Sequence, residues 1–329
     1  MTRLVHIVVL NWLKPQETAT CLATLATLDY VNRRVVVVNN GPADTLLPAI
    51  QPWLDHIDLL QNPTNLGYTG GCNVGIRHAI AAGADYIWLF NVDAVPEPDC
   101  LTKLMAAVVA DARIGMATPV IRYRNQPELV ESGAGRFNPA TCSWTWFESD
   151  FDAELARTDP SRVMLDGTAL LISAALVRRI GLLDDDLFAY HETIDYSMRA
   201  QAAGFQLILV SDASVYHRPD PSEQWPPYVA YYVVRNEMLM WRKHVSGRLR
   251  YKARFWHLLR TIGRLKAETD PDLRDACMAG WWHGEIGVTG ERDPHRRAPL
   301  LVRWLLAGCP RQVLRLLGYR GAIGSGHAG

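Results

Sequence analysis

The sequence lacks several features that would assign it to a simple class. It contains no run of about eighteen uncharged apolar residues, so no segment is long enough to cross a membrane as a helix. The N-terminus shows no charged region followed by an apolar region and a small-residue cleavage site, so we expect no signal peptide. The six cysteines include no Cys-x-x-Cys pair, which predicts reduced thiols rather than disulfides or a zinc site. Together these absences predict a cytoplasmic protein.

The formal net charge is zero, but this balance hides an asymmetry. Residues 235–329 contain 18 Lys and Arg against 8 Asp and Glu, so this region carries +10 and residues 1–234 carry −10. A basic region of this kind favours an anionic partner, either membrane headgroups or nucleic acid. Residues 300–319 mix Leu, Val and Trp with Arg, which is typical of short amphipathic helices that lie on a membrane surface. The alternative is a helical cap whose apolar face packs on the main domain.

Strands and helices alternate along the first part of the chain, which predicts an α/β domain with a parallel sheet. We expect one large domain over residues 1–220, with an irregular insert at about 122–163, because the length exceeds that of a usual single core. Prolines between residues 219 and 227 mark its end, and residues 221–329 are predicted to form a basic, mainly helical extension. The early segments are predicted strands at 4–10, 33–38, 57–61 and 86–90, helices at 15–28 and 74–82, and a polar, Gly-rich loop at 62–73.

The strand predicted at residues 86–90 ends abruptly in Asn91-Val92-Asp93. Its apolar, aromatic composition is typical of a strand buried on both faces. Open α/β sheets bind ligands at the carboxyl ends of their central parallel strands, so Asp93 is a candidate site residue. The alternative is a capped strand end whose polar side chains are only solvated.

Several motifs, taken in their order and spacing over residues 4–240, resemble family 2 glycosyltransferases, and among them the bacterial rhamnosyltransferase-like branch. The resemblance implies a GT-A fold with a mostly parallel central sheet flanked by helices, followed by a helical C-terminal extension. The motifs are Asn11, Asn39-Asn40, Asn65-Leu-Gly67, Gly70-Gly71-Cys-Asn73-Val-Gly75, Asn91-Val-Asp93, Phe188-Ala-Tyr-His-Glu-Thr-Ile-Asp195, Val215-Tyr-His217, and Tyr231-Tyr232 with Arg235-Asn236.

The resemblance also implies which residues hold the nucleotide-sugar donor. The family usually has Asp where this chain has Asn39, but an amide can still accept from a pyrimidine imide N–H and donate to its carbonyl. The glycines let backbone approach a phosphosugar or nucleoside, and their spacing is not the Gly-x-Gly-x-x-Gly of dinucleotide-binding oxidoreductases. The predicted donor-binding residues are Asn11, Asn39, Asn40, Asn65, Gly67, Gly71, Asn73, Asn91 and Asp93.

A divalent cation is the predicted cofactor. Asp93 offers a hard oxygen ligand of the kind that Mg²⁺ or Mn²⁺ takes. The resemblance implies His217 as a second ligand, and an imidazole favours Mn²⁺. The alternative for His217 is a hydrogen-bonded surface histidine. Asn91 replaces the first acid of a strict Asp-x-Asp motif, which leaves one charged ligand in place of two.

Glu192 and Asp195 are the candidate catalytic residues. Their i, i+3 spacing at the start of a predicted helix directs both toward one side. In the family the base comes from an acidic pair in this segment, and here Thr193 occupies the second acidic position. Glu192 is therefore the predicted general base and Asp195 the second candidate. The structural alternative for Asp195 is an i, i+4 ion pair with Arg199.

The predicted function is that of an inverting glycosyltransferase. It would move a sugar from a nucleotide-diphosphate donor, with dTDP-L-rhamnose favoured and a UDP-sugar next, to a hydroxyl of a cell-surface or lipid-linked glycan. We expect it in the cytoplasm, with an anionic surface at the inner membrane face as a partner and no nucleic acid. The alternative is a non-catalytic nucleotide- or sugar-binding protein of the same fold, which Asn39, Asn91 and Thr193 would favour.

Overall fold

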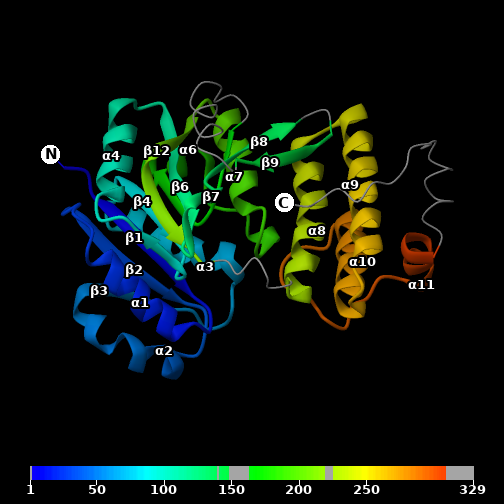
Figure 1. Cartoon of the computed structure of the whole chain (residues 1–329), viewed down its shortest axis with the longest axis horizontal. Coiled ribbons are helices and arrows are strands. Elements are labelled where there is room, and N and C mark those ends of the chain that lie inside the picture. The colour runs from blue at the N-terminus through cyan, green and yellow to red at the C-terminus, as the bar shows by residue number, and fades with distance from the viewer. Residues whose placement is uncertain (1, 139–140, 148–162, 219–224, 309–329) are drawn as a thin grey trace. The chain divides into compact units, whose positions relative to one another are not determined.

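The computed structural model describes residues 2–138, 141–147, 163–218 and 225–308. The chain divides into two compact units (Figure 1). The first consists of residues 1–137, 144–184 and 192–220, and the second of residues 138–143, 185–191 and 221–329. Two short segments, 138–143 and 185–191, therefore interrupt the first unit in sequence and belong to the second.

The first unit is built on a nine-stranded sheet within the described residues, in the order β3-β2-β1-β4-β11-β6-β12-β5, with β7 paired to β6. The part from β3 to β4 is parallel, whereas β11, β5 and β7 run antiparallel to their neighbours. The predicted α/β class is confirmed, and the sheet is mixed beyond its parallel half. The strands are β1 (Val5–Asn11), β2 (Arg33–Asn39), β3 (Ile57–Gln61), β4 (Tyr86–Phe90), β5 (Ala94–Pro96), β6 (Ile114–Tyr123), β7 (Gln126–Ser132), β11 (Ala169–Ser173) and β12 (Gln206–His217). A smaller sheet has the order β10 (Val163–Leu165), β8 (Ala134–Asn138) and β9 (Ser143–Trp146).

Helices cover both faces of this sheet, because successive strand residues point to opposite sides. Val8 and Leu89 face one apolar core, and their neighbours Ile7 and Trp88 face the other. The first core is completed by α3 (Gly67–Ala81), α6 (Ala174–Ile180) and α7 (Glu192–Ala202), and the second by α1 (Pro15–Leu25) and α4 (Cys100–Ala110). The remaining helix of this unit is α2 (Ala43–Ile50).

Helix α3 begins at Gly67, so the prediction of a Gly-rich loop that continues to residue 73 is wrong. Gly71 and Gly75 lie on the helix face toward β1, where a Cβ atom would overlap with Leu10 and Val8. Gly71 was assigned to the loop because glycine is unfavourable inside helices, whereas Gly75 lies in the helix predicted at 74–82. Their physical role here is to let the helix approach the sheet closely.

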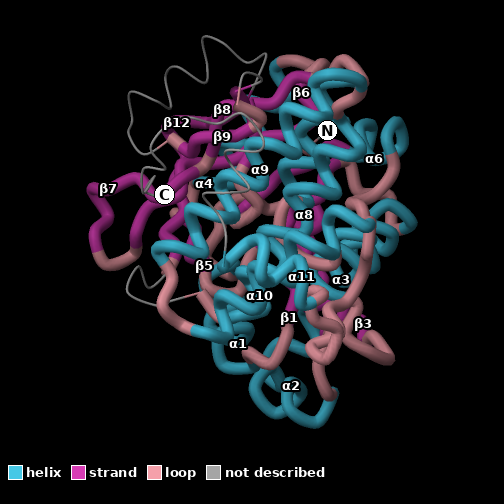
Figure 2. The backbone as a smooth tube through the Cα atoms, turned by 90° about the vertical axis from the view of Figure 1, so that its right-hand side faces the viewer, coloured by secondary structure: helices cyan, strands magenta, loops and turns pink. Residues whose placement is uncertain are grey.

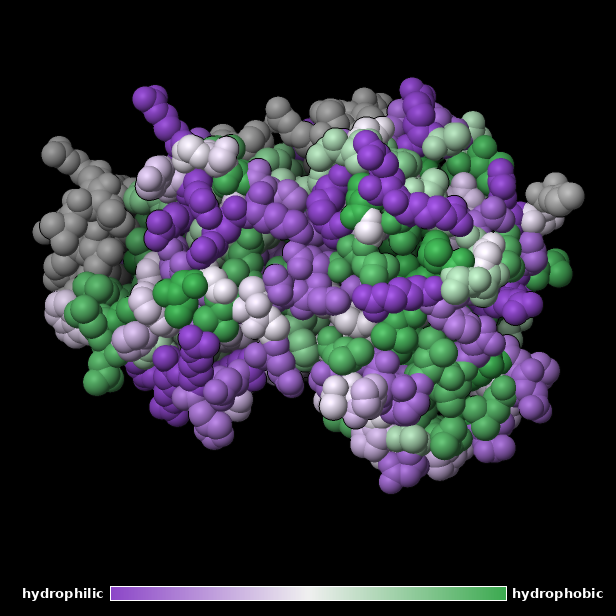
Figure 3. All heavy atoms as spheres, turned by 180° about the vertical axis from the view of Figure 1, so that it is seen from behind, coloured by the Kyte–Doolittle hydropathy of each residue, from purple (hydrophilic) through white to green (hydrophobic). Residues whose placement is uncertain are grey.

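The described part of the second unit is almost entirely helical (Figure 2). It contains α8 (Pro227–His244), α9 (Gly247–Ala267), α10 (Pro271–Ile286) and α11 (Leu300–Arg303), and a π-helical turn at Trp304–Gly308 follows. None of the helices in the described residues is long and apolar enough to span a membrane. The predicted amphipathic segment 300–319 is described only as far as residue 308. On the face shown in Figure 3, hydrophobic and hydrophilic side chains are interspersed, as on most folded proteins.

Helix α10 was not predicted from the sequence, although its ends carry clear signals. The Asp270 side chain accepts a hydrogen bond from the Asp272 amide, Pro271 occupies the first turn, and Gly287 ends the helix in the left-handed conformation. Gly280 and Gly284 face α8, and Cβ atoms there would lie 2.6 Å from the Tyr231 carbonyl oxygen and 2.8 Å from that of Arg235. Close backbone contact between α8 and α10 therefore depends on these two glycines.

A single amide organises the loop at residues 187–190 of the second unit. The Asn236 Nδ2 atom lies 2.9, 2.6 and 2.8 Å from the carbonyl oxygens of Leu187, Ala189 and Tyr190. The Arg235 guanidinium is fully buried beside it and donates to the Leu187 carbonyl oxygen at 2.9 Å. Within this part of the chain, Phe188, Tyr190 and His191 all have positive φ angles, of 63°, 68° and 70°.

We predict that Gly280→Ala destabilises the protein, because its Cβ would meet backbone that cannot move away cheaply. A loss of about 1–3 kcal/mol in the free energy of unfolding is expected, as for other overpacked sites. Gly263→Ala in α9 is the matched control, because nothing lies within 4 Å of its Cβ position. That change should be neutral or stabilise by about 0.5–1 kcal/mol, since Ala favours the helix over Gly. Equal stability of the two variants in denaturant titrations would contradict the close packing of α10 on α8.

Candidate active site

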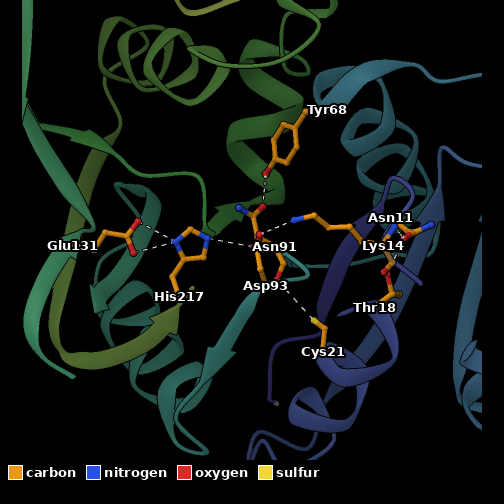
Figure 4. Close-up of polar contacts among 9 residues, drawn as sticks. All are labelled: Asn11, Lys14, Thr18, Cys21, Tyr68, Asn91, Asp93, Glu131 and His217. Atoms are coloured by element: carbon orange, nitrogen blue, oxygen red, sulfur yellow. Dashed lines mark hydrogen bonds and ion pairs between the residues drawn. The ribbon is translucent and has the colours of Figure 1, made fainter. Parts of the chain in front are cut away.

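Asp93, His217 and Glu131 form the centre of the candidate site in the first unit (Figure 4). Asp93 lies in the turn between β4 and β5, and His217 is the last residue of β12, which pairs with β5 so that His217 lies opposite Ala94. The His217 Nε2 atom is 3.3 Å from the Asp93 Oδ1 atom. Its Nδ1 atom is 3.0 Å from both carboxylate oxygens of Glu131 on β7. The imidazole is thus held between two carboxylates.

Positive charge compensates Asp93 from two sides. The Lys14 Nζ atom is 3.1 Å from the Asp93 Oδ2 atom, opposite the oxygen that His217 approaches. Burial alone would raise the pKa of Asp93, but hydrogen bonds and charge from His217 and Lys14 hold it far below its usual range. Burial likewise opposes protonation of His217, but its contacts with Asp93 and Glu131 prevail and raise its pKa to about 10. The site is built to place cationic groups against the Asp93 carboxylate.

The side chains of Asn11 and Asn39, at the ends of two adjacent parallel strands, are bonded to each other. The Asn11 Nδ2 atom donates to the Asn39 Oδ1 atom at 2.7 Å, and Asn11 is completely buried. Its Oδ1 atom accepts from the Lys14 amide and from the Thr18 hydroxyl. In this structure the two amides therefore fix the strand ends and the start of α1. Their predicted contact with the nucleotide base stays a prediction.

The polar residues before α3 form a second group. The Asn40 Nδ2 atom donates to the Gly67 carbonyl oxygen at 2.8 Å, and its Oδ1 atom accepts from Asn62 at 2.7 Å. The Asn65 side chain accepts from the Gly67 amide at 2.9 Å, and Gly67 has a φ of +73° that favours glycine. Gly71 follows one turn later and packs on Leu10 and Asn40. These contacts bring the predicted donor-binding residues around the start of α3 into one place.

Within the described residues, Asn73 bonds to a part of the chain that the other predicted donor-binding residues do not reach. It is completely buried, and its amide forms a reciprocal pair with the backbone of Leu183, at 2.9 Å to the carbonyl oxygen and 3.0 Å from the amide nitrogen. This pair ties α3 to a segment 110 residues further along the chain. The contact explains why the chain has an amide there, and a direct contact with the donor stays a prediction.

A chain of contacts leads from the Asp93 turn to the Glu192 side of the unit. The Tyr68 hydroxyl on α3 is 3.3 Å from the Asn91 Oδ1 atom and 3.4 Å from the Gly167 carbonyl oxygen. A Cβ atom at Gly167 would lie 2.8 Å from Thr193 and 3.8 Å from the Glu192 Oε1 atom. The backbone at Gly167 therefore lies between the Tyr68 hydroxyl and the start of α7. Through Asn91, Tyr68 and Gly167, the predicted base Glu192 is connected to the turn that carries the predicted metal ligand Asp93.

The two candidate catalytic carboxylates differ in their surroundings. Glu192 opens α7 and is 8 % exposed. Asp195 is completely buried and pairs with the Arg199 Nε atom at 2.8 Å, the i, i+4 ion pair that the spacing allows. Arg199 also donates to the carbonyl oxygens of Ile180 and Leu182. Asp195 is thereby engaged in holding α7 to the end of α6, while Glu192 keeps a small exposed surface.

The protein offers fewer side-chain ligands than a divalent cation needs to complete its coordination shell. The described residues contain no group of three or more His, Cys, Asp or Glu side chains suited to hold a metal ion. Asp93 and His217 would supply two adjacent ligands once the ion replaces the proton on the His217 Nε2 atom, since only a neutral imidazole binds a metal. Glu131 on the far nitrogen of His217 gives the carboxylate–histidine arrangement that orients metal-binding imidazoles. Mg²⁺ and related ions commonly take only one or two protein carboxylates and complete their shell with substrate phosphates and water. The residues present fit a cation of that type.

Three residues of the site were missed by sequence reasoning. Glu131 lies in the segment read as an irregular insert, and only the pairing of β7 with β6 brings it to His217. Lys14 and Tyr68 carry no motif of their own. The position of Lys14 three residues after Asn11 offered one signal, because a residue just beyond a strand end must lie near that edge of the sheet.

Comparison with solved structures supports the fold. A mannosyltransferase from Pyrobaculum calidifontis in complex with GDP-Man and Mn²⁺ superposes with a TM-score of 0.56 at 16% identity, covering 95% of this chain and 81% of that one. At this identity the likeness shows the fold alone, which is GT-A, as predicted.

Comparison of sequences identifies the family. A galactofuranosyltransferase from Mycobacterium tuberculosis is 27% identical over 236 residues, covering 69% of this chain and 74% of the relative. An N-acetylglucosaminyl-diphospho-decaprenol L-rhamnosyltransferase from the same organism is 27% identical over 220 residues, covering 59% and 70%. The model of glycosyltransferase-like family 2 matches residues 2–236, which is most of the chain. Since that match covers more than half of the chain and includes Asp93, Glu192 and His217, the chain belongs to glycosyltransferase family 2.

Proposed function

We propose that this glycosyltransferase moves a hexose from a nucleotide-diphosphate donor to a hydroxyl of a glycan acceptor, with inversion at the anomeric carbon. The proposal rests on the position of two kinds of side chain in the first unit: the Asp93–His217 pair, and the Glu192 carboxylate at the start of α7. Asp93 with His217 forms a cation-accepting end. Glu192 forms a carboxylate end, linked to it through Gly167, Tyr68 and Asn91. Group transfer needs both, one for the leaving diphosphate and one for the incoming hydroxyl.

The favoured donor is dTDP-L-rhamnose, and a UDP-sugar is next. The rhamnosyltransferase among the relatives supports the first, and the acceptor named there, a lipid diphosphate, supports a lipid-linked or cell-surface glycan as acceptor. Nucleotide release from a panel of dTDP-, UDP- and GDP-sugars, with Mn²⁺ present, tests the proposal. A donor that is turned over supports an enzyme, whereas binding without any release would support the alternative, a non-catalytic nucleotide- or sugar-binding protein.

Asp93 and His217 would hold the divalent cation, Mn²⁺ or Mg²⁺, and the nucleotide diphosphate would supply further oxygens. When bound, the ion would neutralise the charge that develops on the leaving diphosphate. Glu131 keeps the His217 ring oriented by accepting at Nδ1, which directs Nε2 toward Asp93. The proposed donor contacts come from the strand ends and the start of α3: Asn11, Asn39, Asn40, Asn65, Gly67, Gly71, Asn73 and Asn91.

Asp93→Ala should abolish transfer, because the charged ligand next to the diphosphate is lost. Glu131→Gln keeps the size of the side chain but weakens its hold on His217, so the Mn²⁺ concentration needed for half activity should rise by about 10–100-fold. Asp111→Ala is the control, since that carboxylate forms an ion pair with Arg113 elsewhere on the unit. Activity is measured as nucleotide release over a Mn²⁺ titration. Full wild-type activity in EDTA would overturn the metal assignment.

Glu192 is the proposed general base. A base must reach the acceptor hydroxyl, to within about 3 Å, on the side opposite the leaving group. Glu192 retains a small exposed surface at the start of α7, whereas Asp195 is buried in its ion pair with Arg199. A positively charged partner stabilises the ionised form of a carboxylate and makes it a weaker base. Asp195 is therefore proposed to position α7, and it remains the second candidate for the base.

Glu192→Gln preserves shape and removes the base, so transfer should fall by about 10²–10⁴-fold. Donor affinity, measured by equilibrium binding of the nucleotide, should change little, because the proposed nucleotide contacts lie on other elements. Asp195→Asn should instead lower the thermal midpoint, since it breaks a buried ion pair. A Glu192→Gln enzyme with wild-type turnover, beside a folded but inactive Asp195→Asn enzyme, would reassign the base to Asp195.

The second unit is proposed to contact an anionic membrane surface at the inner face. Leu300, Leu301 and Trp304 are 84, 65 and 57% exposed, although all three are large apolar side chains. They occupy one short helical stretch whose opposite side, at Leu306, is buried in the core of the unit. An exposed apolar strip in a basic region is the pattern of helices that bind a membrane interface.

Replacing both Leu300 and Leu301 by Ser should weaken binding to phosphatidylglycerol-containing vesicles by about a hundredfold or more, because about 1.5–3 kcal/mol is available from each fully buried Leu and about 1.4 kcal/mol corresponds to a factor of ten. Val31→Ser is the control, since Val31 is 87% exposed in the first unit and should not affect the partition. Unchanged vesicle binding together with a lowered thermal midpoint would show that the strip is a docking cap of the protein itself.

A further inference from the structure

A cavity of about 370 Å³ opens within the second unit, between the ends of α8, α9 and α10. Its volume lies in the range of about 300–1,000 Å³ that small-ligand sites occupy. The lining carries three guanidinium groups, those of Arg242, Arg250 and Arg254, and a single carboxylate, that of Glu285. Met238, Gly247 and Tyr251 complete it. None of these residues belongs to the proposed transferase site.

The three arginines are engaged to different degrees. Arg254 forms an ion pair with Glu285, which cancels one charge of each sign. Arg242 donates to the carbonyl oxygens of Gly284 and Glu285 at the end of α10, and keeps its full charge because carbonyls do not neutralise it. Arg250 has neither a hydrogen bond nor an ion pair with the described residues, and it is exposed. The cavity therefore holds two uncompensated cations, one of them fixed in place and one free to reach a ligand.

The surrounding sequence adds to this charge. Residues 242–254 contain six Lys and Arg and no Asp or Glu. Guanidinium groups bind phosphate oxygens through strong, paired hydrogen bonds. We propose that this cavity, lined by Arg242, Arg250 and Arg254, binds a phosphate group, and that the group is carried by an anionic membrane lipid.

The lipid source is favoured by the aromatic side chain on the cavity. Tyr251 lines it and is 74% exposed, so its ring is available on the protein surface beside the arginines. Tyrosine between charged groups and apolar surface is typical of protein segments at the headgroup level of a membrane. Anionic headgroups attract clustered Lys and Arg, each contributing about 1 kcal/mol near the surface. The same unit also exposes Leu300, Leu301 and Trp304. The lipid source rests on the proposed membrane contact of this unit, whereas phosphate binding in the cavity rests on the arginines alone.

The test uses the full chain and the matched variants Arg250→Ala and Arg248→Ala. Both remove one exposed arginine from α9, but only Arg250 lines the cavity. Each protein is titrated with vesicles of phosphatidylcholine with and without phosphatidylglycerol, and separately with inorganic pyrophosphate in EDTA. Arg250→Ala should weaken both interactions by roughly tenfold, as expected for one charged hydrogen bond, whereas Arg248→Ala should change them less than about twofold.

Every other result either identifies a different source of the phosphate group or shows that the cavity is not a binding site. Equal weakening by the two variants would show diffuse charge rather than a cavity, and no binding by the wild type would remove the site altogether. Loss of pyrophosphate binding with unchanged vesicle binding would keep the phosphate chemistry and overturn the lipid source. Tight, Arg250-dependent binding of a single-stranded oligonucleotide, with no preference for phosphatidylglycerol, would overturn the lipid assignment in favour of nucleic acid.

Discussion

The candidate site depends on how β12 pairs with its neighbours. This strand runs parallel to β6 and antiparallel to the short β5, so that His217 lies opposite both Tyr123 and Ala94. A slip of one residue would turn His217 to the other face of the sheet and away from Asp93. The irregularity between Val210 and Ser214 lets the strand change register before it reaches β5. Pro96 is tolerated because β5 lies at the end of the sheet, where a missing amide hydrogen costs little.

Local sequence patterns predicted the parallel half of this architecture well. The apolar runs that became β1, β2 and β4 were recognisable because central parallel strands are buried on both faces, and the polar ends of β1 to β4 had to meet at one edge. Glu131 could not be found in this way, because its position depends on two register shifts in the pairing of β7 with β6. Helices α3 and α10 were misjudged or missed because their glycines look like helix breakers until a close neighbour is known.

Asn39 shows how a departure from the family pattern can suit its surroundings. Its Nδ2 atom lies 3.0 Å from the Gly41 carbonyl oxygen and 2.8 Å from the Gln61 Oε1 atom. A carboxylate in the same place would set an anionic oxygen against two acceptors in a buried environment, which is costly. The amide instead donates on one side and accepts from Asn11 and the Gly41 amide on the other. The neutral pair of amides thus closes the strand ends without a buried charge.

The Tyr231-Tyr232…Arg235-Asn236 motif acquires a physical meaning within the second unit. Left-handed backbone at non-glycine residues costs about 1–3 kcal/mol each, and three such residues occur between Phe188 and His191. The Asn236 amide offsets part of that cost, because its Nδ2 atom lies within hydrogen-bond distance of three carbonyl oxygens of this loop. Arg235 lies over the rings of both tyrosines and donates to the same loop. The last of these contacts is with the Tyr190 carbonyl oxygen, so the motif fixes the backbone of this loop within the second unit as far as Tyr190.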